Sequence, residues 1–209
     1  MLAAHPTSAK PKTLRLLAAA TLACALGVST GCGEDRVTYT PAHGSHMSGN
    51  ESEESSGAAD FSHKDIMFAE MMIPHHEQAI TMSDLALRNS TDARVRALAV
   101  RIKTAQAPEI ALMKSWVEES GMAGMHGPAD HTMAGMLSEA EIEEMQSATG
   151  RAFDTLFLTG MIAHHQGAVD MAKAVAASGN AAVAKLAASI ISSQTAEIAE
   201  MKALLSELR

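Results

Sequence analysis

Two pairs of adjacent histidines occur in this chain, and each pair lies close to methionine. Residues 72–76 read MIPHH, and residues 161–165 read MIAHH, 89 positions later. Imidazole nitrogen together with thioether sulfur is a ligand mixture that selects soft monovalent ions such as Cu(I) and Ag(I). The chain has 15 methionines and 10 histidines, which is ample material for such a site. The two motifs are therefore the first candidates for chemistry.

Other metals fit this sequence less well. Ca²⁺ and Mg²⁺ need clusters of oxygen ligands, and the motifs contain none. Di-iron sites in helical bundles use Glu-x-x-His motifs, which the sequence lacks. The two cysteines, Cys24 and Cys32, are too few for a cysteine-based zinc site. A lone histidine on an apolar face is usually a structural core residue, but a doubled pair at matching positions favours a metal role.

The elements that must position these motifs form an internal repeat. Apolar positions step by four, three, four and three residues from Phe68 to Met82, and the same steps run from Phe157 to Met171. This is the period of a helix with one buried face. The matching segments 102–116 and 190–204 supply a second helix in each copy. The pattern predicts an all-α antiparallel four-helix bundle made of two hairpins, 61–120 and 138–209, joined by a connector at 121–137. We also expect a short helix from 138 to 145.

Polar side chains interrupt the buried faces of these helices. We expect His75 and His164 to point toward the bundle axis, and His76 and His165, about 100° further round, to face a neighbouring helix. A buried polar group without a partner is costly, so these groups must partner each other or a ligand. The corresponding polar residues of the second helices are Gln106, Glu109, Gln194 and Glu197. We expect them to orient the histidines or to form a structural polar layer.

The connector between the hairpins is rich in glycine and in residues that bind soft metals. Flexible, exposed methionine is poor core material but suits a labile Cu(I) handoff. The alternative is a flexible linker whose methionines cap the end of the bundle. The candidate metal ligands here are Met122, Met125, His126, His131, Met133 and Met136.

The N-terminus has the pattern of an export signal. A basic start precedes an apolar run from Leu16 to Val28, and small residues then lead to Cys32. We expect a secretory or lipoprotein signal peptide at 1–31, with Cys32 as the lipidated first residue of the mature chain and a membrane anchor. The alternative is an ordinary secretory signal. Residues 32–60 are polar and lack an apolar period, which predicts a disordered tether.

Composition and missing motifs exclude several classes of function. The formal charge is −8 and no basic patch is visible, which argues against binding of nucleic acid. The sequence shows no nucleophile–base set, phosphate-binding loop or nucleotide fingerprint, so we do not expect an enzyme. A haem-binding or other redox bundle is an alternative, because methionine and histidine also ligate haem iron. A structural or adaptor lipoprotein without metal is another.

The doubled motifs carry a resemblance to a known family. The two MI-x-HH segments and the two Q-x-x-E-I-x-x-M-K segments (106–114 and 194–202) resemble the family called domain of unknown function 305. The resemblance covers about residues 60–209. It implies a ferritin-like bundle, exported from the cell, that binds Cu(I) or Ag(I) through methionine and histidine for buffering, resistance or handoff. By position, the implied ligands are Met72, His75, His76, Met82, Met161, His164, His165 and Met171. The four methionines have a second interpretation, as filler of an alanine-rich core.

Overall fold

The computed structural model describes residues 60–124 and 133–208, and these residues form five α-helices and no strands. The first hairpin consists of α1 (His63–Asn89) and α2 (Ala93–Ser120). The short α3 (Glu139–Ser147) precedes the second hairpin, α4 (Gly150–Val175) and α5 (Ala181–Glu207). The predicted all-α class and duplicated hairpin are confirmed. The short helix extends two residues beyond its predicted end.

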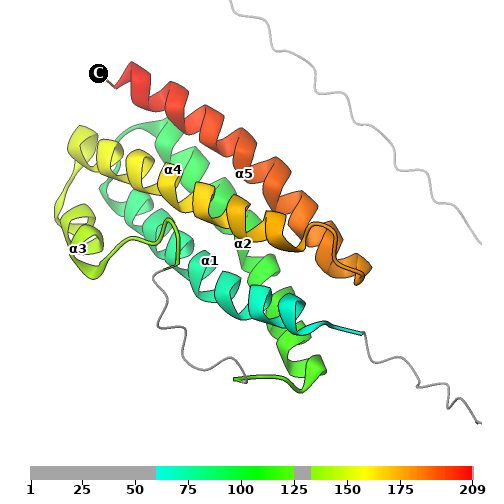
Figure 1. Cartoon of the computed structure of the whole chain (residues 1–209). Coiled ribbons are helices and arrows are strands. Elements are labelled where there is room, and N and C mark those ends of the chain that lie inside the picture. Colours follow the sequence, from blue (N-terminus) through cyan, green and yellow to red (C-terminus); the bar gives the residue numbers. More distant parts are fainter. Residues whose placement is uncertain (1–59, 125–132, 209) are drawn as a thin grey trace, which may run out of the picture. The chain divides into compact units, whose positions relative to one another are not determined.

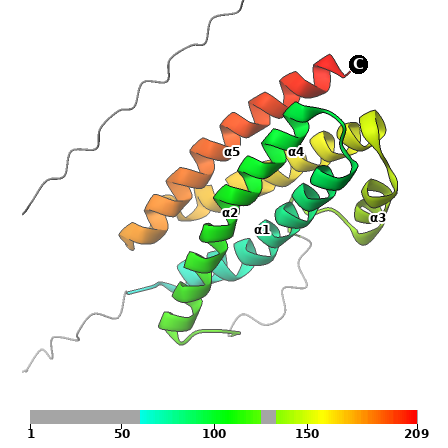
Figure 2. The same ribbon diagram turned by 180° about the vertical axis from the view of Figure 1, so that it is seen from behind.

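The two hairpins pack through their first helices. α1 and α4 run antiparallel and lie side by side, with α2 and α5 as their partners within each hairpin (Figure 1 and, from behind, Figure 2). α3 contacts α1 and α4 near the start of α4. The adjacency of α1 and α4 matters for function, because it brings the two His-His motifs together.

Local sequence sets the helix boundaries. A capping box starts α1: the Asp65 amide donates to Ser62 Oγ at 3.2 Å, and the Ser62 amide donates to Asp65 Oδ2 at 2.9 Å. Such a capping box satisfies amides that would otherwise lack partners. Asp154, which matches Asp65 in the repeat, lies inside α4 rather than at its start. α4 begins after Thr149, whose side chain makes no capping bond.

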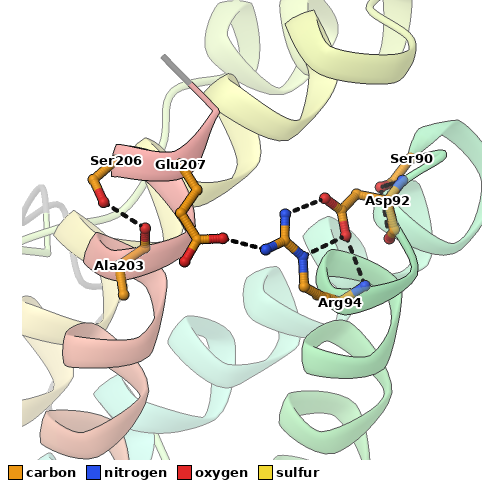
Figure 3. Close-up of polar contacts among 6 residues, drawn as sticks. All are labelled: Ser90, Asp92, Arg94, Ala203, Ser206 and Glu207. Carbon is orange, nitrogen blue, oxygen red and sulfur yellow. Dashed lines mark hydrogen bonds and ion pairs between the residues drawn. The ribbon is translucent and has the colours of Figure 1, made fainter.

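Ion pairs join the outer helices at the end of the bundle. Asp92 caps α2 by accepting from the Arg94 amide at 2.8 Å, and the Arg94 guanidinium bridges Asp92 and Glu207 near the C-terminus of α5 (Figure 3). About two helical turns from the Arg94–Glu207 pair, Arg101 of α2 pairs with Glu200 of α5, with 2.6 Å between Nη2 and Oε1. Arg94, Glu207, Arg101 and Glu200 are about half exposed, so the pairs between α2 and α5 contribute little to stability.

The buried apolar residues form two clusters rather than one continuous core. The first core cluster lies around the α1–α2 turn and includes Leu98, Phe153 and Phe157. The second core cluster lies around the α4–α5 turn and includes Phe68 and Trp116. Between them, four fully buried histidines and two buried glutamines form a layer, which we call the histidine layer. Its members are His75, His76, His164, His165, Gln106 and Gln194.

None of the helices in the described ranges is both long enough and apolar enough to span a bilayer. The predicted signal peptide at 1–31, the predicted lipidation site Cys32 and most of the predicted tether at 32–60 lie outside the described residues.

Candidate metal centre

The centre of the histidine layer is a contact between two imidazole rings, one from each hairpin. The ring centroids of His75 and His164 are 3.7 Å apart, and the ring planes are inclined by 37°. Both side chains are fully buried. They come from α1 and α4 at matching positions of the repeat, so the expected orientation toward the bundle axis is the one observed.

The second histidine of each motif faces the other helix of its own hairpin. His76 Nε2 lies 2.9 Å from Glu109 Oε2 on α2, and His165 Nε2 lies 2.7 Å from Glu197 Oε2 on α5. Because a carboxylate accepts, the imidazole Nε2–H donates in both pairs. The two glutamates therefore orient these rings, which is one of the two roles expected for them.

Burial keeps the central pair of rings uncharged. Burial lowers the pKa of His75 to about 4, against the opposing effect of its hydrogen bond to the Ala134 carbonyl. Burial and then the neighbouring histidines, His75 first, lower the pKa of His164 to about 2. At neutral pH both rings are neutral, and a neutral imidazole has one nitrogen with a free lone pair.

The layer contains many buried nitrogens without a hydrogen-bond partner. In the described chain, Nδ1 of all four histidines and also Nε2 of His164 lack a partner. Unsatisfied buried polar atoms are rare and each needs an explanation. A bound metal ion is one explanation, because a nitrogen lone pair that accepts no hydrogen bond is free to coordinate a metal. The donor set of the layer thus fits a nitrogen-binding cation.

The carboxylates do not extend this set into a cluster of hard ligands. Across residues 60–124 and 133–208, no group of three or more His, Cys, Asp or Glu side chains is arranged to hold a metal ion. Any further ligand must come from elsewhere, and sulfur is the remaining candidate. Among the described residues, therefore, no more than two His, Cys, Asp or Glu side chains converge at one point, a number that suits an ion of low coordination number.

The methionines near the layer are not equivalent. Met72, Met82 and Met161 are fully buried, with Met72 in the second core cluster and the other two in the first. Met171 is only partly buried and packs against the second core cluster from its edge. Methionine thus lies on both sides of the histidine layer, but the two halves of the repeat differ in how far it is buried.

A short irregular segment crosses the layer from outside. Residues 133–137, which we call the strap, run over α4, and His75 Nε2 donates to the Ala134 carbonyl oxygen at 3.3 Å. A Cβ atom at Gly167 would lie 1.8 Å from that oxygen, so only glycine on α4 permits this approach. The Gln78 side chain fixes the end of the strap by bonding both the amide and the carbonyl of Leu137, each at 2.8 Å. Periodicity alone did not predict this contact.

The rest of the predicted connector ligands are dispersed or not described. Met133 and Met136 belong to the strap and are partly buried, and Met122 packs against the second core cluster. Met125, His126 and His131 lie outside the described residues. Gln106 and Gln194 are buried in the histidine layer, where their side-chain oxygens lack a partner in the described chain.

Comparison with known proteins places these features in context. The model of a family described as Domain of unknown function (DUF305) matches residues 65–205. A solved DUF305 protein from Streptomyces coelicolor is 31% identical, with a TM-score of 0.65 over 69% of this chain and 92% of that one. CopM in its Cu(I)-bound form is 32% identical, with a TM-score of 0.56 over 71% and 98%. CopM co-crystallised with Ag is 33% identical, with a TM-score of 0.56 over 68% and 96%. None of the curated proteins matches the chain significantly.

Proposed function

This chain belongs to the DUF305 family, and we propose that it binds Cu(I) and Ag(I) at the histidine layer as an exported, non-enzymatic protein. The activity would be buffering of a toxic soft metal or its handoff to another protein. Solved structures of CopM with Cu(I), Cu(II) and Ag bound support binding of these metals within the family.

The observation that carries the proposal is the contact between the tilted rings of His75 and His164, which have buried, unpartnered nitrogens. These two neutral rings are in contact across the α1–α4 interface, and both are fully buried, so water does not compete for their nitrogen lone pairs. His76 and His165 add an unpartnered Nδ1 each, on rings held by Glu109 and Glu197. A carboxylate that accepts from the far nitrogen fixes the ring and raises its basicity as a ligand.

The chemistry of the surrounding side chains sets the preference for a monovalent ion. Met72 and Met161 lie three residues before His75 and His164, so each shares a helix face with its histidine. Uncharged imidazole and thioether ligands do not neutralise a divalent charge in a buried site, whereas they match the softness of Cu(I) and Ag(I). The layer would therefore hold a small soft cation between the two core clusters.

The ring contact also bears on the haem alternative. A haem ligated by His75 and His164 would need the whole macrocycle between the two rings, yet their centroids are 3.7 Å apart. The described apolar residues of the two core clusters pack on both sides of the layer, where a macrocycle would have to lie. The geometry thus favours a bare ion over a macrocycle.

The proposal is tested by Cu(I) competition titration against a chromogenic chelator. We compare the purified protein with a variant in which His75, His76, His164 and His165 are changed to Ala. A second variant, His75→Leu with His164→Leu, fills the same space with apolar side chains and guards against loss of folding. His63→Ala, which removes an exposed histidine, is the matched control.

We expect both core variants to lose at least tenfold in Cu(I) affinity and the control to match the wild type. Bound Ag(I) should also raise the melting temperature of the wild type, because a ligand of the native state stabilises it. Equal, weak binding by wild type and core variants would exclude the proposed site. An unchanged melting temperature with Ag(I) would instead favour a structural or adaptor protein.

We further propose that the protein is exported and held at the membrane by lipid on Cys32. The support is the sequence of residues 1–32, with its basic start, apolar run and small residues before the cysteine. Mass spectrometry of the protein from membrane and soluble fractions, compared with Cys32→Ser, tests this. Release of the variant into the soluble extracytoplasmic fraction is expected, and an unmodified Cys32 in the wild type would contradict the anchor.

A further inference from the structure

A surface groove between α1 and α4 is lined by three methionines. Met67 and Met71 come from α1 and Met171 from α4, with Phe68 and Val175 also in the lining, and the groove has a volume of about 170 Å³. Met67 and Met71 are four residues apart, so their side chains are neighbours on one helix face. The groove lies on the second-core-cluster half of the bundle.

Methionine at these positions is not required by the repeated packing. The residues that match Met67 and Met71 in the second copy are Leu156 and Gly160. There the strap covers the helix, and a Cβ at Gly160 would lie 2.9 Å from the side chain of Leu137. In the first copy, the described residues that line the groove come from α1 and α4 alone, and Met67 remains 42% exposed. The first copy thus places exposed methionine at this position, whereas in the second copy Leu156 and Gly160 line a pocket together with the strap residues Met136 and Leu137.

We propose that Met67, Met71 and Met171 form a surface thioether site that takes up Cu(I) or Ag(I) and delivers it to the histidine layer. The inference rests on the proposed function and adds an entry point to it. Three thioethers on two adjacent helices are a ligand type that soft monovalent ions accept and that hard cations do not.

A route inward begins at the same side chains. Met171 packs against the second core cluster, which contains Met72, the residue that follows Met71. Met72 is fully buried and shares a helix face with His75, three residues later. An ion would exchange one sulfur ligand for the next and then for an imidazole nitrogen. Each step breaks one metal–sulfur bond as another metal–ligand bond forms, with no change of oxidation state and no proton released.

The charge at the groove makes this the weaker of the two sites. Lys64 also lines the groove, and its ammonium opposes a bound cation. Lys64 is exposed, so salt screens the repulsion. Weak binding at the surface and stronger binding inside is the order that an entry site needs.

The test uses the purified protein labelled with ¹³C at methionine methyl groups and titrated with Ag(I). Three variants separate the sites: a groove variant with Met67, Met71 and Met171 changed to Leu, the core variant His75→Leu with His164→Leu, and Met145→Leu as control. Leucine preserves size and apolar character but removes sulfur. Met145 is buried in the first core cluster, away from the groove. Loading is followed by stopped-flow transfer of Cu(I) from a chromogenic chelator.

We expect the methyl signals of the groove methionines to shift with Ag(I) in the wild type and in the core variant. The groove variant should bind one Ag(I) fewer and load Cu(I) at least fivefold more slowly, while Met145→Leu behaves as the wild type. An unchanged stoichiometry and loading rate in the groove variant would overturn the entry site and leave the proposed function standing. Unchanged Cu(I) affinity in the core variant would instead overturn the proposed function.

Discussion

Substitution of Gly167 by alanine should displace the strap, and Gly160→Ala provides a matched control on the same helix. Both changes add one methyl group to the interior of α4, where alanine is favoured over glycine by about 1 kcal/mol. At Gly160 the new Cβ meets the end of the Leu137 side chain at 2.9 Å, which can rotate away. At Gly167 it meets the Ala134 carbonyl oxygen at 1.8 Å, and a backbone group cannot rotate away.

The size of the difference follows from the contacts. Gly160→Ala should be neutral or stabilising by up to about 1 kcal/mol. In Gly167→Ala, overpacking costs about 1–3 kcal/mol, and loss of the bond between His75 and the Ala134 carbonyl costs about 1 kcal/mol more. Against the gain in helix propensity, the net destabilisation is about 1–3 kcal/mol. For a domain of this size each kcal/mol shifts the melting temperature by about 2–4 °C.

Thermal unfolding followed by circular dichroism measures both variants under the same conditions. Gly167→Ala should melt several degrees below the wild type, and Gly160→Ala at or above it. Moving the strap also uncovers the His75 ring, so Gly167→Ala should load Cu(I) faster. If Gly167→Ala were as stable as Gly160→Ala and loaded at the wild-type rate, the strap would not be held against α4 as described, and the reasoning would fail.

Three further predictions concern the histidine layer and the helix ends. The metal-free protein should lose stability between pH 6.5 and pH 4, by about 3 kcal/mol from His75 alone, because the unfolded chain takes up a proton on His75 near pH 6.5 and the folded protein does so only near pH 4. His164, whose pKa burial lowers further, adds to the loss in the same direction. Urea unfolding at pH 7 and pH 4 checks this, and a flat profile would contradict it. Glu109→Gln and Glu197→Gln should each cost about 1–3 kcal/mol and lower Cu(I) affinity about 10–100-fold, measured by unfolding and competition titration; a large difference between the two would contradict the equivalence of their hydrogen bonds. Ser62→Ala should cost about 1 kcal/mol by removing the cap of α1, and equal melting temperatures would show that the cap is dispensable.

Helical periodicity predicted the centre of the site because both of its halves lie on regular helices. A seam that repeats every three and four residues fixes which side chains face the axis, and the duplication supplies the partner ring. Thus the direction of His75 and His164 toward the bundle axis, and of His76 and His165 toward a neighbouring helix, followed from the sequence.

The strap and the groove were not predicted, because irregular backbone has no period and its path depends on tertiary contacts. A signal was nevertheless present in the departures from the repeat. Gly167 stands where the first copy has Gln78, and Gly160 stands where it has Met71. Each glycine makes room for the strap, and Gln78 holds its end. Positions at which the two copies of the repeat carry different residues therefore indicate structural features that only one copy has.

The rings of His75 and His164 come from equivalent positions of two copies of one unit, so both hairpins contribute equally to the centre of the site. Such a site requires only one sequence motif, present in two copies. Two identical single-hairpin chains, associating as a homodimer, would bring the same pair of imidazoles together. In the fused chain each half can instead differ away from the shared centre, as the strap on α4 and the exposed Met67 on α1 do.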